Sequence, residues 1–105
     1  MSQYETPAVV IGGGVNGLGI IGNLGRNGVD VYCVVNKKNE AVYSKYCKKY
    51  FVSPGVEHDL QKLTIFLTKF KHKIGREAVL FPTSDISLIN VSLLISIYFI
   101  LDPWN

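Results

Sequence analysis

The chain has 105 residues, of which 48% are hydrophobic and 18% charged, a composition too apolar for a disordered protein and a length that holds one domain. Its two cysteines are too few for a disulfide scaffold, they are not spaced as a CxxC pair, and the polar residues 1–5 are unlike a secretory signal. The expected setting is therefore reducing and cytoplasmic, and a net charge of +3 favours no particular partner.

The first strong pattern is a buried strand followed by glycines. Residues 8–11 form an apolar run rich in β-branched side chains, which predicts a strand buried on both faces. Gly12, Gly14 and Gly17 then match G-x-G-x-x-G, and apolar residues at helical spacing follow over residues 18–26. Residues 29–35 predict a second strand. This order is a βαβ unit, whose two strands are parallel.

Two further strands and a helix complete the predicted sheet. Residues 36–49 are polar and rich in tyrosine, which predicts a short helix or an irregular turn around residues 40–46 before a brief third strand at 50–52. Apolar residues at intervals of three and four predict an amphipathic helix over residues 58–74 that ends at Gly75. Residues 78–81 predict a fourth strand that stops at Pro82. The expected fold is α/β and Rossmann-like, one domain over residues 1–105, with a parallel sheet in the order 3-2-1-4 and flanking helices.

The end of the chain is unusually apolar. The 16 residues from Ile86 to Leu101 carry no charge and 12 of them are apolar, but this stretch is shorter than the roughly 20 residues of a membrane span. Its polar interruptions fit a mostly buried helix that runs into a final extended piece. We expect the apolar tail, residues 86–105, to be an interface covered by a second copy or by further protein, or a truncated end.

The glycine turn has a definite chemical use. Glycines let the backbone approach a ligand closely and leave the first N–H groups of the following helix directed at an anion, such as a phosphate or a carboxylate. The same glycines would serve close packing of the helix on the strand, so both interpretations stay open. The candidate anion-binding residues are Gly12, Gly13, Gly14, Val15, Asn16 and Gly17.

A dinucleotide site would need one more residue, an acid at the end of the second strand that holds a ribose hydroxyl. Asn36 occupies that position, 19 residues after Gly17, and Lys37 and Lys38 follow it. An amide does not favour NAD, whereas the two lysines suit the additional phosphate of NADP or are simply solvated. A small NAD(P)-binding module with cofactor-binding residues Asn36, Lys37 and Lys38 is therefore an alternative function.

Thr83, Ser84 and Asp85 follow the fourth strand. In the order 3-2-1-4 this loop faces the glycine turn across the crevice where the connections of neighbouring strands turn opposite ways. Asp85 is then either a residue that orients a ligand or an acid in the first turn of a capped helix.

The remaining polar groups predict little chemistry. Lysines alternate with tyrosines over residues 43–50, as in single-strand binders, but the stretch is short and its tyrosines are expected to pack on the sheet edge, so no nucleic-acid partner is expected. His58 and His72 are expected to be solvated and Cys33 to be a small core residue. The sequence predicts neither a metal site nor a nucleophile–base pair, and we assign no catalytic residue.

Three motifs in order carry a family resemblance. PAVVIGGGVNGLG at residues 7–19, YSKYC at 43–47 and LFPTSD at 80–85 resemble the N-terminal domain of ATP-grasp carboxylate–amine ligases. The resemblance is to the predicted carboligase and D-aspartate-ligase-like group, and more distantly to carbamoyl-phosphate synthase large chains. It covers about residues 6–92, and the three motifs together are more specific than the glycine motif alone.

The resemblance implies a Rossmann-like preATP-grasp domain that precedes a larger ATP-binding module. In related ligases the glycine turn and the fourth-strand loop face the acceptor substrate, while ATP and magnesium are held mainly by the later module. Carried over by position, Gly12, Gly13, Gly14 and Gly17 would form the substrate-side anion loop, opposite Thr83, Ser84 and Asp85. Asn36 stands where the family commonly has an acid, and the ATP-grasp module is absent from the sequence. We therefore expect no cofactor in this chain and no ATP hydrolysis by the chain alone.

Overall fold

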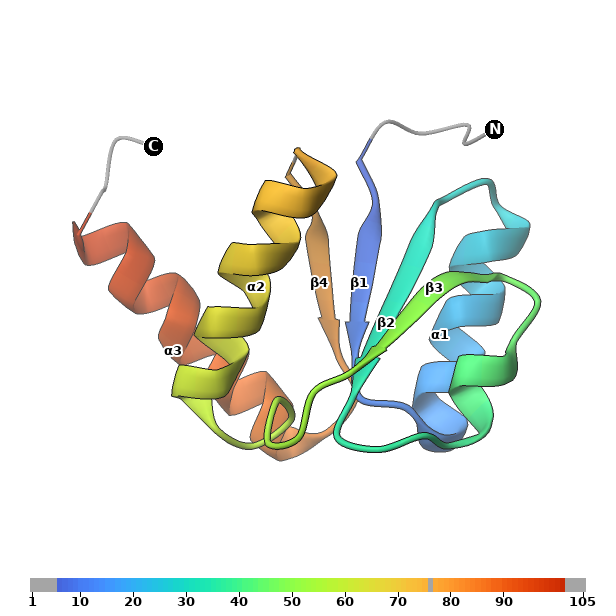
Figure 1. Cartoon of the computed structure of the whole chain (residues 1–105), viewed down its shortest axis with the longest axis horizontal. Coiled ribbons are helices and arrows are strands. Elements are labelled where there is room, and N and C mark those ends of the chain that lie inside the picture. Colours follow the sequence, from blue (N-terminus) through green and yellow to red (C-terminus); the bar gives the residue numbers. More distant parts are fainter. Residues whose placement is uncertain (1–5, 76, 102–105) are drawn as a thin grey trace.

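The computed structural model describes residues 6–75 and 77–101 and forms a four-stranded parallel sheet with helices on both faces (Figure 1). The strand order is β3-β2-β1-β4, so the predicted α/β, Rossmann-like fold with order 3-2-1-4 is confirmed. In chain order the elements are β1 (Ala8–Ile11), α1 (Gly14–Arg26), β2 (Val31–Val35), the 3-10 helix η1 (Glu40–Tyr43), β3 (Cys47–Val52), α2 (Leu60–Ile74), β4 (Val79–Pro82) and α3 (Asp85–Leu101).

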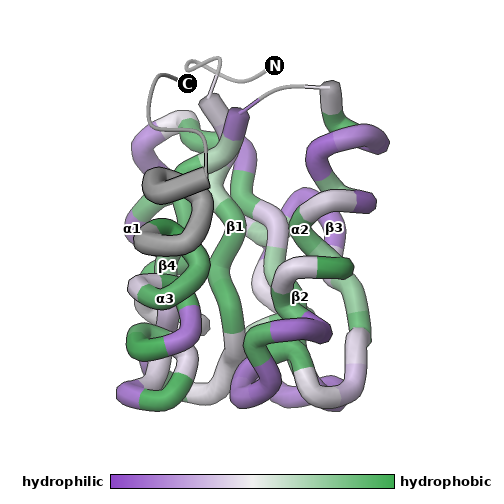
Figure 2. Tube along the Cα trace, turned by 90° about the vertical axis from the view of Figure 1, so that its left-hand side faces the viewer, coloured by the Kyte–Doolittle hydropathy of each residue, from purple (hydrophilic) through white to green (hydrophobic). Residues whose placement is uncertain are grey.

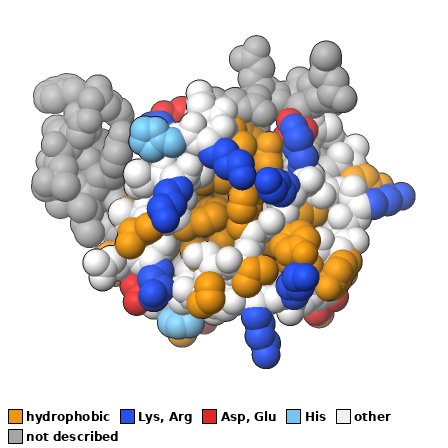
Figure 3. All heavy atoms as spheres, viewed as in Figure 1, with side chains coloured by type: hydrophobic (Ala, Val, Ile, Leu, Met, Phe, Trp, Pro, Cys, Tyr) orange, Lys and Arg blue, Asp and Glu red, His pale blue; other side chains and the backbone are white. Residues whose placement is uncertain are grey.

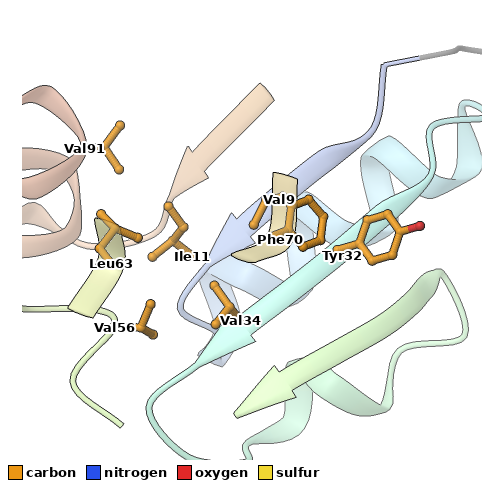
Figure 4. Packing of buried hydrophobic residues seen from close by; sticks show 8 residues of the cluster. All are labelled: Val9, Ile11, Tyr32, Val34, Val56, Leu63, Phe70 and Val91. Carbon is orange, nitrogen blue, oxygen red and sulfur yellow. The ribbon is translucent and has the colours of Figure 1, made fainter. Parts of the chain in front are cut away.

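The two central strands, β1 and β2, divide the core into two layers. Alternate side chains of each strand enter opposite layers, as the two-residue repeat of a strand requires. One layer lies under α2 and α3 and is shown in Figure 4, where Val9, Ile11, Tyr32, Val34, Val56, Leu63, Phe70 and Val91 pack together. The other lies under α1 and η1 and contains Val10, Ile21, Val31, Cys33, Val35, Ala41 and Val42. Every residue of β1 and β2 is buried, which confirms the prediction that the first strand is covered on both faces and shows that the second is covered too.

Several predicted boundaries differ from the structure. Helix α1 begins at Gly14 rather than Leu18, because the glycines supply its first turn, with the Gly17 N–H bonded to the Gly13 oxygen at 3.0 Å. Strand β3 begins at Cys47 rather than Tyr50, since its pairing with β2 starts there and continues past a register shift. Helix α2 begins after Asp59, whose carboxylate accepts the N–H groups of the first turn, and it ends, as predicted, at Gly75 with φ of 75°.

The apolar tail is the largest departure from the sequence prediction. Residues 86–101 belong to one helix, α3, and no extended piece follows within the described part of the chain. The helix is not mostly buried either, because Ile86, Ile89 and Ile95 are each more than half exposed. The sheet ends at β4 and only one side of α3 reaches it, so the opposite side of the helix stays uncovered. Residues 102–105, which complete the predicted tail, and residues 1–5 lie outside the described residues.

We expect the layer under α2 to dominate stability. Leu63 is fully buried and Ile65, on the same helix, is 48% exposed. Leu63→Ala should lower the free energy of unfolding by about 2–5 kcal/mol, whereas Ile65→Ala should change it by about 0.5 kcal/mol or less. Urea denaturation of both variants measures the difference, and equal effects would contradict this packing.

Candidate functional site

The candidate site lies where the carboxyl ends of the parallel strands meet. Strand β1 lies between β2 and β4, so its connection runs over one face of the sheet and the connection after β4 runs over the other. Open α/β sheets bind ligands beside such a reversal of direction. The glycine turn after β1 and the loop after β4 therefore both lie at the edge of the sheet where a ligand is expected.

The glycine turn is tightly enclosed. Gly12 has φ of +96° and Gly14 has φ of +66°, a left-handed backbone that side chains disfavour. A Cβ atom on Gly12 would collide with Thr83 Oγ1 and lie 2.9 Å from Glu57 Oε1. A Cβ atom on Gly17 would lie 3.2 Å from the Gly12 carbonyl oxygen. Close packing of α1 on β1 therefore explains Gly17, while the backbone at Gly12 is surrounded by polar side chains.

The loop after β4 contacts the glycine turn directly. The Thr83 hydroxyl donates to the Ile11 carbonyl oxygen at 2.9 Å, and the Asn16 amide donates to the Thr83 carbonyl oxygen at 3.3 Å. Ser84 caps α3, since its Oγ accepts the Ser87 N–H at 3.2 Å, and Asp85 is an exposed acid in the first turn. The structure thus brings Thr83 next to the glycine turn, and it gives Ser84 and Asp85 roles at the helix terminus.

Glu57 is a site residue that the sequence analysis missed. Its carboxylate, which lies beside Gly12, accepts the Asn36 N–H at 2.8 Å, and its own N–H donates to Asn36 Oδ1 at 3.1 Å. The Asn36 amide also lies 3.3 Å from Nδ1 of His58, which is exposed, as is His72. An acid therefore stands next to the end of β2 although Asn36 is an amide, because the loop after β3 brings it there. Its position just after a predicted strand was the available signal.

The Asn39 side chain accepts a hydrogen bond from the first N–H group of α1. Its Oδ1 accepts N–H groups from Gly14 at 3.1 Å and from Ala41 at 3.0 Å, so one amide oxygen serves the starts of two helices. The next two N–H groups of α1 belong to Val15 and Asn16, and the N-cap residue, Gly13, has no side chain to accept them. Those two donors, with the positive end of the helix dipole behind them, are the groups that an anion would meet.

The two predicted cofactor-binding lysines are both exposed. The Lys38 ammonium lies 5.7 Å from the centre of the Tyr50 ring, whose hydroxyl raises the lysine pKa, and Lys37 is exposed. Lysines also lie over aromatic rings along β3, with Lys48 over Tyr32 and Lys49 over Phe51. Figure 3 shows basic side chains dispersed between hydrophobic ones on the face that carries α2 and β3. Of the three predicted cofactor-binding residues, Asn36 thus lies next to the glycine turn through its hydrogen bonds with Glu57, whereas Lys38 lies over the Tyr50 ring.

Cys33 lies beneath the glycine turn. Its thiol is fully buried and donates to the Gly12 carbonyl oxygen at 3.4 Å, which confirms it as a core residue. Burial, and next the neighbouring Cys47 and Glu57, raise the pKa of Cys33 from 9.0 to about 12. The native thiol consequently keeps its proton at pH values where the unfolded thiol loses it.

This shift predicts a loss of stability in alkali. The unfolded chain releases the Cys33 proton near pH 9.0 and the native chain only near pH 12, so the native state is disfavoured as the pH rises through that interval. Between pH 8 and 10 the free energy of unfolding of the wild type should fall by about 1 kcal/mol more than that of Cys33→Ala. Urea denaturation of both proteins across this range is the measurement, and parallel pH profiles would contradict the assignment.

Among the described residues, no three His, Cys, Asp or Glu side chains are grouped so that they could hold a metal ion. Over the same part of the chain, no helix combines the length and the apolar character needed to cross a bilayer. A comparison with protein-family models, curated proteins and solved structures gives no match.

Proposed function

We propose that this chain is the substrate-side domain of an ATP-grasp carboxylate–amine ligase-like protein. In this role the chain binds a small carboxylate-bearing molecule at the carboxyl edge of the sheet, and an ATP-binding module, in cis or in trans, supplies the chemistry. The proposal rests on the resemblance of three motifs, and the geometry that supports it is the contact between two of them.

That contact carries the proposal. The glycine turn and the loop after β4 are separated by about 70 residues in the sequence, yet Thr83 donates to the carbonyl oxygen of Ile11 and accepts from Asn16. The two hydrogen bonds join the loop after β4 to the end of β1 and to the first turn of α1. A carboxylate there would accept the N–H groups of Val15 and Asn16, which have no side-chain cap.

Glu57 adds a requirement on the ligand. A carboxylate beside Gly12 repels a purely anionic molecule but attracts an ammonium group or accepts from a hydroxyl. The helix terminus and Glu57 together therefore favour a molecule that carries both a carboxylate and a hydrogen-bond donor, such as an amino acid. This combination disfavours the pyrophosphate of a dinucleotide, because Asn39 already occupies the Gly14 N–H.

The resemblance assigns ATP and magnesium to the ATP-grasp module. In the proposed role this chain orients the acceptor substrate and does not itself activate a carboxylate.

Binding of aspartate is the direct test, because aspartate carries both groups whereas succinate lacks the amine. In a titration followed by the amide signals of the ¹⁵N-labelled chain, aspartate should shift Val15, Asn16 and Thr83, with a dissociation constant on the order of 1 mM. Succinate should bind more weakly, and Glu57→Gln should remove the difference, since the neutral amide no longer attracts the ammonium group.

Two glycine variants provide the matched control. A Cβ atom on Gly13 would collide with the Asn39 side chain, whereas one on Gly19 meets nothing within 4 Å. Gly13→Ala should weaken aspartate binding by about 10-fold by displacing Asn39 from the start of α1, a loss of about 1.4 kcal/mol, and Gly19→Ala should leave it unchanged.

Other outcomes would replace the proposal. Saturable binding of NADP or NAD at micromolar concentration would identify a dinucleotide-binding module instead. Steady ATP turnover by the purified chain, abolished by substitution of Gly14, would contradict a domain that needs a separate ATP-binding module. Equal binding of aspartate by Gly13→Ala and Gly19→Ala would show that aspartate does not bind at the glycine turn.

A further inference from the structure

Helix α3 forms a second surface, which is apolar, unlike the polar surroundings of the glycine turn. Five large apolar residues of this helix are 47–58% exposed, and we call them the α3 face: Ile86, Leu88, Ile89, Leu93 and Ile95. Figure 2 shows α3 as a mainly hydrophobic tube alongside β4. In contrast, α2 exposes one such residue, Ile65, and the large apolar residues that α1 exposes are Val15 and Leu18.

The α3 face has the relief of a helix-packing surface. Ile86, Ile89 and Leu93 are spaced by three and four and follow one ridge, while Leu88 and Ile95 follow a second. Ser92 lies between the ridges, so a small side chain separates two rows of large ones. Ridges of one helix pack into such grooves of another.

The strand beside α3 ends the sheet and is also incompletely covered. β4 pairs only with β1, and Val79 at its start is 50% exposed. On the face of the sheet opposite α3, an apolar hollow of about 300 Å³ lies beside this strand, lined by Thr6, Pro7, Ala8, Leu24, Val29, Val79 and Phe81. Apolar surface therefore lies on both faces of the sheet near β4.

We propose that the α3 face is the interface of a homodimer, with α3 of a second copy packed against it across a two-fold axis. Such an interface must be complementary to itself. The α3 face meets this condition because it contains both ridges and groove and because no residue from Ile86 to Ile95 is charged, so two copies meet without like-charge repulsion.

The exposed area is of the right size. The α3 face and Val79 together expose roughly 600 Å² of surface, at the upper limit of the largest apolar patch on a typical monomer. Two such surfaces bury about 1,200 Å² together, which is the lower end of the range for specific interfaces and fits a weak, concentration-dependent dimer. The opposite edge of the sheet, β3, carries the exposed Lys48 and Lys49, which disfavour edge pairing there. Association is thus directed to α3 and closes after two copies.

Sedimentation of the full chain tests the dimer. From about 5 to 500 μM the wild type should pass from monomer to dimer without larger species, with a dissociation constant on the order of 10 μM. Ile89→Glu should raise that constant at least about 30-fold, because it brings two carboxylates to the contact between the helices. Ile65→Glu, the same change at a similarly exposed site on α2, should leave it unaltered.

The folding of each variant is checked separately from its association. Circular dichroism and thermal unfolding of the dilute proteins should show that the variants are folded, and Leu93→Gln provides a milder change on the same ridge. A wild type that stays monomeric at 500 μM, mass that grows beyond two copies, or equal weakening by Ile65→Glu would each overturn the proposal. Monomers that bind lipid vesicles through α3 would identify a membrane surface as the occupant instead. None of these results depends on the aspartate site.

Discussion

The close approach of α1 to the end of β1 is the constraint on which the rest of the structure depends. The Gly17 Cα comes so near to the Gly12 carbonyl that a Cβ atom would lie 3.2 Å from it. This contact lets the chain reverse immediately after β1, while the Gly12 N–H still bonds to the Val34 oxygen of β2 at 2.8 Å. A bulkier turn would lift α1 away from the sheet and would separate Asn16 from Thr83.

The same edge of the sheet holds two opposite electrical features. The start of α1 offers partial positive charge, and the Glu57 carboxylate lies beside Gly12, held by its hydrogen bond from Asn36. Asn39, rather than Glu57, accepts the first N–H of the helix. Under the proposed function, this arrangement would select a ligand by the order of its charged groups as well as by its total charge.

The features best predicted from the sequence are the buried strands, because each is a continuous apolar run. β1 and β2 are continuous apolar runs that are buried on both faces. The glycine motif and helix between them implied parallel pairing, and both this pairing and the predicted order of the four strands were confirmed. Glu57 was missed because its contacts with Asn36 join residues 21 apart in the sequence, across a loop whose path no periodicity predicts. Which side of α3 would face the sheet was not predicted, for another reason. Its apolar residues surround the whole helix, so composition gave no indication of which side would face the sheet.

The parallel arrangement also has a consequence for how the chain reaches its native state. Ala8 of the central strand pairs on one side with Val31 and on the other with Val79, near the opposite end of the described chain. Contacts between such distant segments require closure of long loops, whose entropy is lost before the contacts stabilise the chain. Folding is therefore slower than in proteins built from hairpins and local helices. During synthesis, β1 must wait for β4 to leave the ribosome with one of its two edges unpaired, and that interval is when the nascent chain is most exposed to misassociation.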